Sequence, residues 1–166
     1  MIVHQAKPTG SNDTSAFEQL VSPYVSPVFN LVYWISCGDA DTCSVTREVF
    51  CRLHRMLLSS RDEQPFSLWV YRVAVNVCLD LLPHPPRLKR SAEGEPLRDQ
   101  LLQALSEHSY EDRAILFFKD VLGLPYEETA EIMDLPIGYV KKSLAFVRMH
   151  LARSIDLVAL KNQARI

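Results

Sequence analysis

Histidine and cysteine, the side chains most often used for covalent or metal chemistry, are scattered along this chain of 166 residues. Cys51 and His54 could share one face of a helix, but two candidate ligands are too few for a structural zinc site. The sequence also has no glycine-rich phosphate loop, nucleophile elbow or His-Glu-x-x-His motif. We therefore expect a protein without catalytic activity, bound metal or cofactor. We expect reduced core cysteines, because all four lie in apolar stretches of helical pattern: Cys37, Cys43, Cys51 and Cys78.

Charge is distributed unevenly along the chain. The net charge of −2 argues against a protein that binds nucleic acid unaided, because such domains usually carry a large basic excess. Residues 107–134 are acidic, and their only basic side chains apart from His108 are Arg113 and Lys119. Residues 137–153 contain no acid and carry Lys141, Lys142, Arg148 and Arg153. A basic segment directly after an acidic one indicates a local contact with a polyanion.

Residues 123–144 have the pattern of a helix, a tight turn and a second helix. Glu127 and Glu128 fall in the first turn of the first helix, where the helix dipole favours acidic side chains. Asp134 lies at the turn, where it tolerates a left-handed backbone at some cost. Pro136 fits the first position of the second helix, which needs no N–H donor. The residues of this helix expected to point inward are Val140, Leu144 and Val147.

The other face of this second helix carries the candidate DNA contacts. They are Tyr139, Lys141, Lys142, Ser143, Phe146 and Arg148. A recognition helix in the major groove uses its exposed N-terminal residues for base edges and phosphates. The alternative is an amphipathic helix whose basic face is only solvated.

The spacing of apolar residues predicts an all-α fold, with two small helical domains joined by a short linker. The three helices of the N-terminal domain are expected at residues 15–37, 41–58 and 66–82. Pro23 and Pro27 predict a kink or break in the first of them, and Asp39 or Asp41 is expected to cap the second. The four helices of the C-terminal domain are expected at residues 97–105, 110–122, 126–133 and 136–155. The resulting division is a disordered arm at 1–14, an N-terminal domain at 15–82, a linker at 83–96 and a helix-turn-helix domain at 97–166.

Three stretches, in this order, resemble motifs of the extracytoplasmic-function (group IV) RNA polymerase sigma factors. Residues 39–50, with Asp-Ala-Asp and Arg-Glu-Val-Phe, resemble the family's polymerase-binding helix. Residues 66–82 resemble its promoter-melting helix, and residues 122–141 resemble its DNA-binding module. The likeness covers about residues 15–155, with the linker in the corresponding place.

The resemblance implies a sigma factor, which binds core RNA polymerase and directs it to specific promoters. The N-terminal domain would bind polymerase and open the −10 element, and the C-terminal domain would read the −35 element. The implied polymerase contacts are Asp39, Asp41, Arg47 and Glu48. The implied −10 contacts, which stack on or capture unpaired bases, are Arg61, Trp69, Tyr71, Arg72, Asn76 and Asp80. The basic linker residues, which could meet the DNA backbone or only keep the linker soluble, are Arg87, Lys89 and Arg90.

Other readings of the same residues stay open. Trp69 could be a core residue, and Asn76 and Asp80, four residues apart, could support one another on a solvated face. The chain could be a divergent sigma-like regulatory protein that binds a partner without melting promoters. The loss of usual arginines favours that function, whereas the retained Asn76 and Asp80 and the intact helix-turn-helix disfavour it. A stand-alone helix-turn-helix regulator would explain only the C-terminal half.

The resemblance also implies the partners, which are core RNA polymerase, promoter DNA and an anti-sigma regulator. No apolar run approaches the roughly 20 residues of a membrane span, so we expect no membrane insertion. The first fifteen residues lack the apolar core of a signal peptide, and we therefore expect a cytoplasmic protein.

Overall fold

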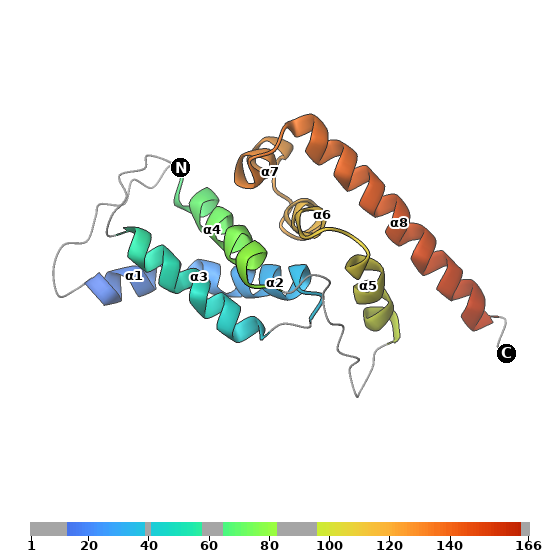
Figure 1. Cartoon of the computed structure of the whole chain (residues 1–166), viewed down its shortest axis with the longest axis horizontal. Coiled ribbons are helices and arrows are strands. Elements are labelled where there is room, and N and C mark those ends of the chain that lie inside the picture. The colour runs from blue at the N-terminus through green and yellow to red at the C-terminus, as the bar shows by residue number, and fades with distance from the viewer. Residues whose placement is uncertain (1–12, 39–40, 58–64, 83–95, 164–166) are drawn as a thin grey trace.

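The computed structural model describes residues 13–38, 41–57, 65–82 and 96–163, and all regular elements in these ranges are helical (Figure 1). The N-terminal helices are α1 (Asp13–Val21), α2 (Val25–Ile35), α3 (Thr42–Leu57) and α4 (Phe66–Leu81). The C-terminal helices are α5 (Pro96–Ser106), α6 (Tyr110–Leu116), α7 (Tyr126–Met133) and α8 (Ile137–Gln163). The expected all-α fold class is thus confirmed. Within the described ranges, no helix has the length and apolar character needed to cross a membrane.

The expected break in the first helix lies between α1 and α2. A 3-10 turn, Ser22–Tyr24, joins the two helices and contains Pro23. Pro27 falls in the first turn of α2, where a missing N–H leaves no hydrogen bond unmade. The α2 helix then ends in a left-handed turn at Cys37 and Gly38, with φ of 53° and 73°.

Asp41 caps α3, as one of the two sequence alternatives predicted. Its Oδ1 accepts a hydrogen bond from the Ser44 N–H at 3.2 Å, which satisfies an otherwise unpaired donor at the helix start. Asp39, the other alternative, lies outside the described residues. The prediction of core cysteines is half wrong: Cys37 and Cys78 are buried, but the other two cysteines, on α3, are exposed.

The helix-turn-helix forms as the sequence predicted. Asp134 has a left-handed backbone with φ of 52° between α7 and α8. Val140, Leu144 and Val147 are buried on the inner face of α8. Pro136 stands one residue before α8 rather than at its first position, since its carbonyl accepts the first helical bonds, from the N–H groups of residues 139 and 140.

A π-helical turn, Phe117–Val121, continues α6 and was not expected from the sequence. Its closing bond runs from the Leu122 N–H to the Phe117 carbonyl at 3.0 Å. The first two residues of this turn, Phe117 and Phe118, are both buried.

The N- and C-terminal halves pack against each other. Figure 1 shows α6 and α7 beside α4, with α5 and α8 on the far side from α3. One apolar core contains residues of α2, α3 and α4 together with Tyr110, Ala114, Phe117, Phe118 and Ile132 of the C-terminal half. A second core, mainly of α5, α6 and α8, lies in the C-terminal half. The two halves therefore share part of their apolar interior.

Candidate nucleic-acid interface

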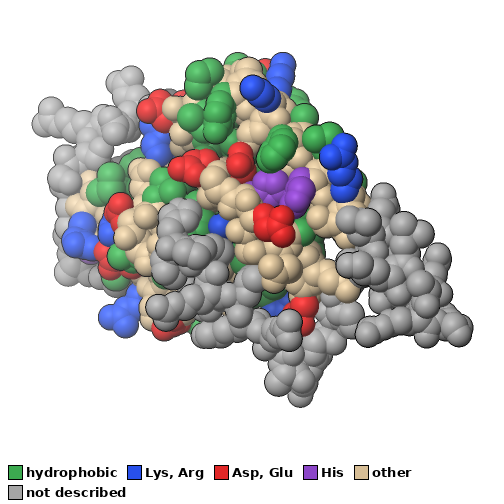
Figure 2. All heavy atoms as spheres, turned by 45° about the vertical axis from the view of Figure 1, so that its right-hand side comes forward, with side chains coloured by type: hydrophobic (Ala, Val, Ile, Leu, Met, Phe, Trp, Pro, Cys, Tyr) green, Lys and Arg blue, Asp and Glu red, His purple; other side chains and the backbone are tan. Residues whose placement is uncertain are grey.

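The outer face of α8 is built by a helix whose opposite side is buried. Because Val140 and Leu144 fix the inner face, the neighbouring Tyr139, Lys141 and Lys142 are exposed. Phe146, two turns along, is 55% exposed, which is unusual for a phenylalanine. Figure 2 shows hydrophobic and basic side chains next to each other on this side of the molecule. The face offers both cations and apolar contacts.

Ser143 does not belong to this outer face, so the expectation that it points outward is wrong. It is 8% exposed, and its Oγ donates a hydrogen bond to Oδ1 of Asp112 on α6. The physical reason is its spacing, because Ser143 lies three residues after Val140 and four before Val147, which are both buried. Its side chain therefore holds α8 against α6.

Arg148 is exposed but engaged. Its guanidinium binds both carboxylate oxygens of Asp120, with 3.0 Å between Nε and Oδ2. The hydrogen bond that Arg148 donates to Asp120 raises the pKa of Arg148. A phosphate that binds the Nε and Nη2 groups of Arg148 therefore has to displace this carboxylate.

The two lysines of α8 differ in their surroundings. Lys141 Nζ lies 5.3 Å from the centre of the Tyr126 ring, over which Lys119 Nζ also lies at 4.2 Å. Lys142 is exposed and makes no ion pair within the part of the chain that the structure describes. It is the cation of this face most available to a phosphate.

On α4, the candidate −10 residues are divided between surface and interior. Trp69 is half-buried and packs on the core beside Phe66, with ring centroids 5.7 Å apart. Tyr71 is only 8% exposed, between the rings of Tyr24 and Phe118, and burial raises its pKa. In this arrangement the Tyr71 ring is covered and does not offer a face to a base. The cause is the C-terminal half, whose Phe118 covers it.

Arg72 of α4 is half-buried and also meets the C-terminal half. Its Nη2 donates a hydrogen bond to the carbonyl of Glu131 on α7. Asn76, one turn further along α4, is exposed. Among the candidates on α4, the Asn76 amide is thus a surface group, whereas the Arg72 guanidinium is held by α7.

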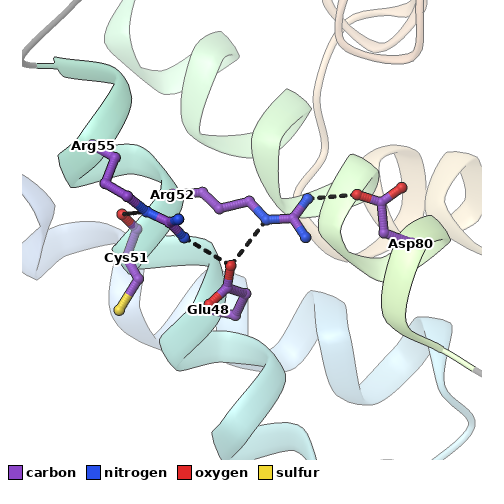
Figure 3. Close-up of polar contacts among 5 residues, drawn as sticks. All are labelled: Glu48, Cys51, Arg52, Arg55 and Asp80. Atoms are coloured by element: carbon purple, nitrogen blue, oxygen red, sulfur yellow. Dashed lines mark hydrogen bonds and ion pairs between the residues drawn. The ribbon is translucent and has the colours of Figure 1, made fainter.

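Asp80 pairs with α3 rather than supporting Asn76. Figure 3 shows the Arg52 guanidinium between the carboxylates of Glu48 and Asp80. Arg55 adds a bond of 2.9 Å from Nη2 to the same Glu48 oxygen. The hydrogen bond from Arg52 is the largest cause that lowers the pKa of Glu48. The group is a charged network on the surface of α3 and α4.

Sequence reasoning missed Arg52 and Arg55 in this network. The signal was the spacing of four and seven residues from Glu48, which places all three on one helix face. Of the other expected polymerase contacts, Arg47 is exposed and Asp41 serves as the helix cap. The expected site residues that lie outside the described ranges are Asp39, Arg61, Arg87, Lys89 and Arg90.

A pair of histidines also escaped the sequence analysis, because 42 residues separate them. His108 Nε2 and His150 Nδ1 are 3.0 Å apart, and His150 Nε2 lies 3.3 Å from Oε2 of Glu107. Burial, followed by the neighbouring His150, lowers the pKa of His108. Phe146 of α8 contacts the His108 ring with centroids 5.7 Å apart. Among the described residues, no group of three or more ligands could hold a metal ion.

Comparison with known proteins identifies relatives over most of the chain. The family model described as sigma-70, region 4 matches residues 98–151. The ECF RNA polymerase sigma-E factor of Haemophilus influenzae is 30% identical over 87% of this chain and 89% of that protein. The protein of the same name from Escherichia coli K12 is 28% identical over 80% of this chain and 82% of that protein.

Solved structures show the same fold. The structure of CnrH in complex with the cytosolic domain of CnrY has a TM-score of 0.71 and 22% identity, over 89% of this chain and 92% of that chain. The sigma factor RpoE in complex with the anti-sigma factor NepR from Bartonella quintana has a TM-score of 0.65 and 13% identity, over 86% of this chain and 98% of that chain. The fold is thus shared, and the 30% identity over most of both chains shows that this protein belongs to the family of ECF RNA polymerase sigma factors.

Proposed function

We propose that the chain is a promoter-specific transcription-initiation factor that binds core RNA polymerase and directs it to its promoters. The observation that carries this proposal is the relationship to ECF sigma factors along nearly the whole chain. The exposed lysines at the start of α8 support it, because a recognition helix needs cations beside the groove. The polymerase would supply the chemistry, and the chain itself would have no catalytic activity.

The division of labour follows the proposed domains. Residues 15–82 would bind polymerase and open the −10 element, residues 97–166 would read the −35 element, and the linker at 83–96 would connect them. On α8, Lys142 and Lys141 are suited to phosphate contacts, and Tyr139 and Phe146 to apolar contacts with base edges.

Asn76 is the residue of α4 best suited to hold an unpaired base. It is exposed, and an amide can hydrogen-bond to the Watson–Crick edge of a flipped base. Trp69 is half-buried, and its indole is a candidate for stacking on a base. Arg72 and Asp80 would join only after releasing their present partners on α7 and α3.

We propose that the polymerase contact lies on α3. Its outer face carries Arg47 together with the network of Glu48, Arg52 and Arg55. These charged side chains lie opposite the buried Val49 and Leu53, which hold α3 on the core. A charged helix face is a suitable docking surface for a protein partner.

We also propose an anti-sigma regulator and a cytoplasmic location. Two structures of the same fold are complexes with another protein, CnrH with CnrY and RpoE with NepR, and NepR is named as an anti-sigma factor. A factor that works on chromosomal DNA with polymerase acts in the cytoplasm. Affinity capture of the full chain from native cells, followed by identification of stoichiometric partners, tests this part.

A second function is supported by two observations. Tyr71 is covered and Arg148 is paired with Asp120, so the chain could be a sigma-like protein that binds partners without melting promoters. The two functions differ in what happens after polymerase binding.

Run-off transcription with purified core polymerase separates them. We expect promoter-specific transcripts, and we expect Asn76→Ala to reduce them on duplex templates far more than on a template already unpaired at −10. Gln103→Ala, an exposed amide on α5, is the matched control and should leave both templates unaffected. Binding to polymerase without transcripts on either template would support the second function. Specific duplex binding without polymerase would support a stand-alone helix-turn-helix regulator.

A further inference from the structure

Two imidazole rings meet where α8 passes the turn between α5 and α6. His108 Nε2 of this turn and His150 Nδ1 of α8 are 3.0 Å apart, and the ring planes cross at 77°. His108 is 7% exposed, whereas the His150 side chain is 33% exposed. Figure 2 shows histidine side chains at the surface, next to acidic ones. The pair thus joins a buried imidazole to one that solvent can reach.

The two facing nitrogens have the spacing of two ligands on one metal ion. Nitrogens bound at about 2.0–2.1 Å to the same ion lie roughly 2.9–3.4 Å apart, for bond angles from about 90° to the tetrahedral value. Without an ion, the 3.0 Å separation is a hydrogen bond between two neutral rings, of which one carries the shared proton. An ion can replace this proton, which then moves through water to the second nitrogen of the same ring.

A carboxylate holds the more accessible ring. Glu107 Oε2 lies 3.3 Å from His150 Nε2, the nitrogen that does not face His108. Histidines that bind metal ions commonly donate their second N–H to a carboxylate in this way, which fixes the tautomer and the orientation of the ring. Here the arrangement leaves the lone pair of His150 Nδ1 directed at His108 Nε2.

The other ring is held through its backbone. The His108 N–H donates to the Leu105 carbonyl at 3.0 Å, and the His108 carbonyl accepts two hydrogen bonds from Arg113. Phe146 of α8 packs edge-on against the ring, with centroids 5.7 Å apart. Burial, followed by His150, lowers the pKa of His108, so this ring is neutral at pH 7 and can offer a lone pair.

The surroundings of the pair suit a divalent cation that prefers nitrogen ligands. Glu107 and Asp112 favour positive charge at His108, and Arg113 opposes it. Neutral imidazoles select Zn²⁺, Ni²⁺ or Cu²⁺, whereas Mg²⁺ prefers oxygen ligands. No third protein ligand joins the two rings among the residues that the structure describes. Water therefore holds the remaining positions, and such an ion exchanges rather than maintaining the fold.

We propose that His108 and His150 form an exchangeable site for a divalent transition-metal ion, which links α8 to the turn between α5 and α6. The bound ion joins two segments that are 42 residues apart in the sequence. Because Phe146 lies against the His108 ring, the ion also fixes an aromatic group on the outer face of α8. Neither histidine has a part in the proposed function, so the site does not depend on it.

Calorimetric titration of the untagged full chain with NiCl₂, ZnCl₂ or CuCl₂ tests the site. The parent chain carries His4→Gln, Cys43→Ser and Cys51→Ser, because a histidine near the amino terminus and two exposed thiols also bind such ions. We expect one ion per chain at about pH 7.5 and no binding of MgCl₂. The affinity should fall toward about pH 5.5, where protons compete for the rings. The electron paramagnetic resonance spectrum of the Cu²⁺ complex should show coupling to two nitrogens.

Three variants of this parent chain assign the ligands. His150→Gln removes the more exposed ligand and should weaken binding by about tenfold or more. Glu107→Gln keeps both rings but removes the carboxylate behind one of them, and it should weaken binding by about tenfold. His54→Gln, at a half-buried histidine of α3, is the matched control and should leave the affinity unchanged.

Thermal unfolding gives a second readout, because an ion that binds only the folded chain stabilises it. Tm should rise with Ni²⁺ concentration for the parent chain and stay constant for His150→Gln. The proposal is overturned if none of the three ions binds, if His150→Gln binds as tightly as the parent chain, or if His54→Gln weakens binding equally. If His150→Gln does not fold, the Cu²⁺ spectrum of the parent chain decides, and fewer than two coupled nitrogens would overturn the proposal. None of these outcomes depends on whether the chain binds polymerase.

Discussion

Removal of Asp120 should increase the DNA affinity of the recognition helix through Arg148. Asp120 holds the Arg148 guanidinium with both carboxylate oxygens. Asp120→Ala frees this cation and also removes a negative charge beside α8. Each phosphate contact adds about 0.9 to the slope of log K against log salt, so the slope should steepen by about one. One such contact weakens binding about 3.5-fold when salt rises fourfold. Stability should change by less than about 1 kcal/mol, because the ion pair is partly exposed.

The assay is equilibrium binding of the reconstituted holoenzyme to its promoter, at several salt concentrations. Glu128→Ala is the matched control, because it removes an exposed acidic side chain of α7 without freeing an arginine. We expect tighter binding and a steeper slope for Asp120→Ala, and a nearly unchanged slope for Glu128→Ala. Equal slopes for the two variants would refute the argument, since the gain would then come from net charge alone. An unchanged affinity would mean that Arg148 does not face the phosphates.

Three further predictions concern stability. Asp41→Ala should lower the free energy of unfolding by about 1 kcal/mol in urea titration, because it removes the cap on the Ser44 N–H. Leu144→Ala should lower the free energy of unfolding by roughly 2–5 kcal/mol, because Leu144 is 1% exposed on the inner face of α8. The variant should lose DNA binding at temperatures where the wild type still binds. Burial and His150 lower the pKa of His108 below 6.5. As the pH falls, the unfolded chain therefore binds a proton at His108 before the folded chain does. Stability should therefore fall as pH drops below about 6.5, and His108→Gln should reduce that fall in urea titrations at pH 7.5 and 5.5.

Local features of the fold were predictable because local physics determines them. The three- and four-residue spacing of Val140, Leu144 and Val147 defines a buried helix face whatever it packs against. Asp134 in the turn and Asp41 at the helix start follow from their short side chains and preferred backbone conformations. These elements needed no knowledge of distant segments.

The partners of the site residues were not predictable, because they depend on which elements meet. Ser143 was predicted to point outward because its partner, Asp112, could not be identified from the sequence. Asp112 lies 31 residues earlier, on a helix whose orientation the periodicity alone does not give. The resemblance implies a −10 contact at Tyr71, and nothing in the spacing of α4 identifies Phe118, which lies far along the chain, as the ring that packs on it. Cys51 shows the converse error, since its apolar sequence neighbours suggested burial for a residue on the solvent face of α3.

These intramolecular contacts suggest an order of events for the proposed function. Arg148 is held by Asp120, and Arg72 is held by α7, so cations proposed to contact nucleic acid are engaged within the free chain. A chain of net charge −2 with engaged arginines has little affinity for DNA on its own. Arg72 would have to leave the Glu131 carbonyl, and the Nε and Nη2 groups of Arg148 would have to leave Asp120, before these groups could contact nucleic acid. Polymerase binding should thus precede promoter binding, and the free chain should protect no promoter at concentrations where the holoenzyme does.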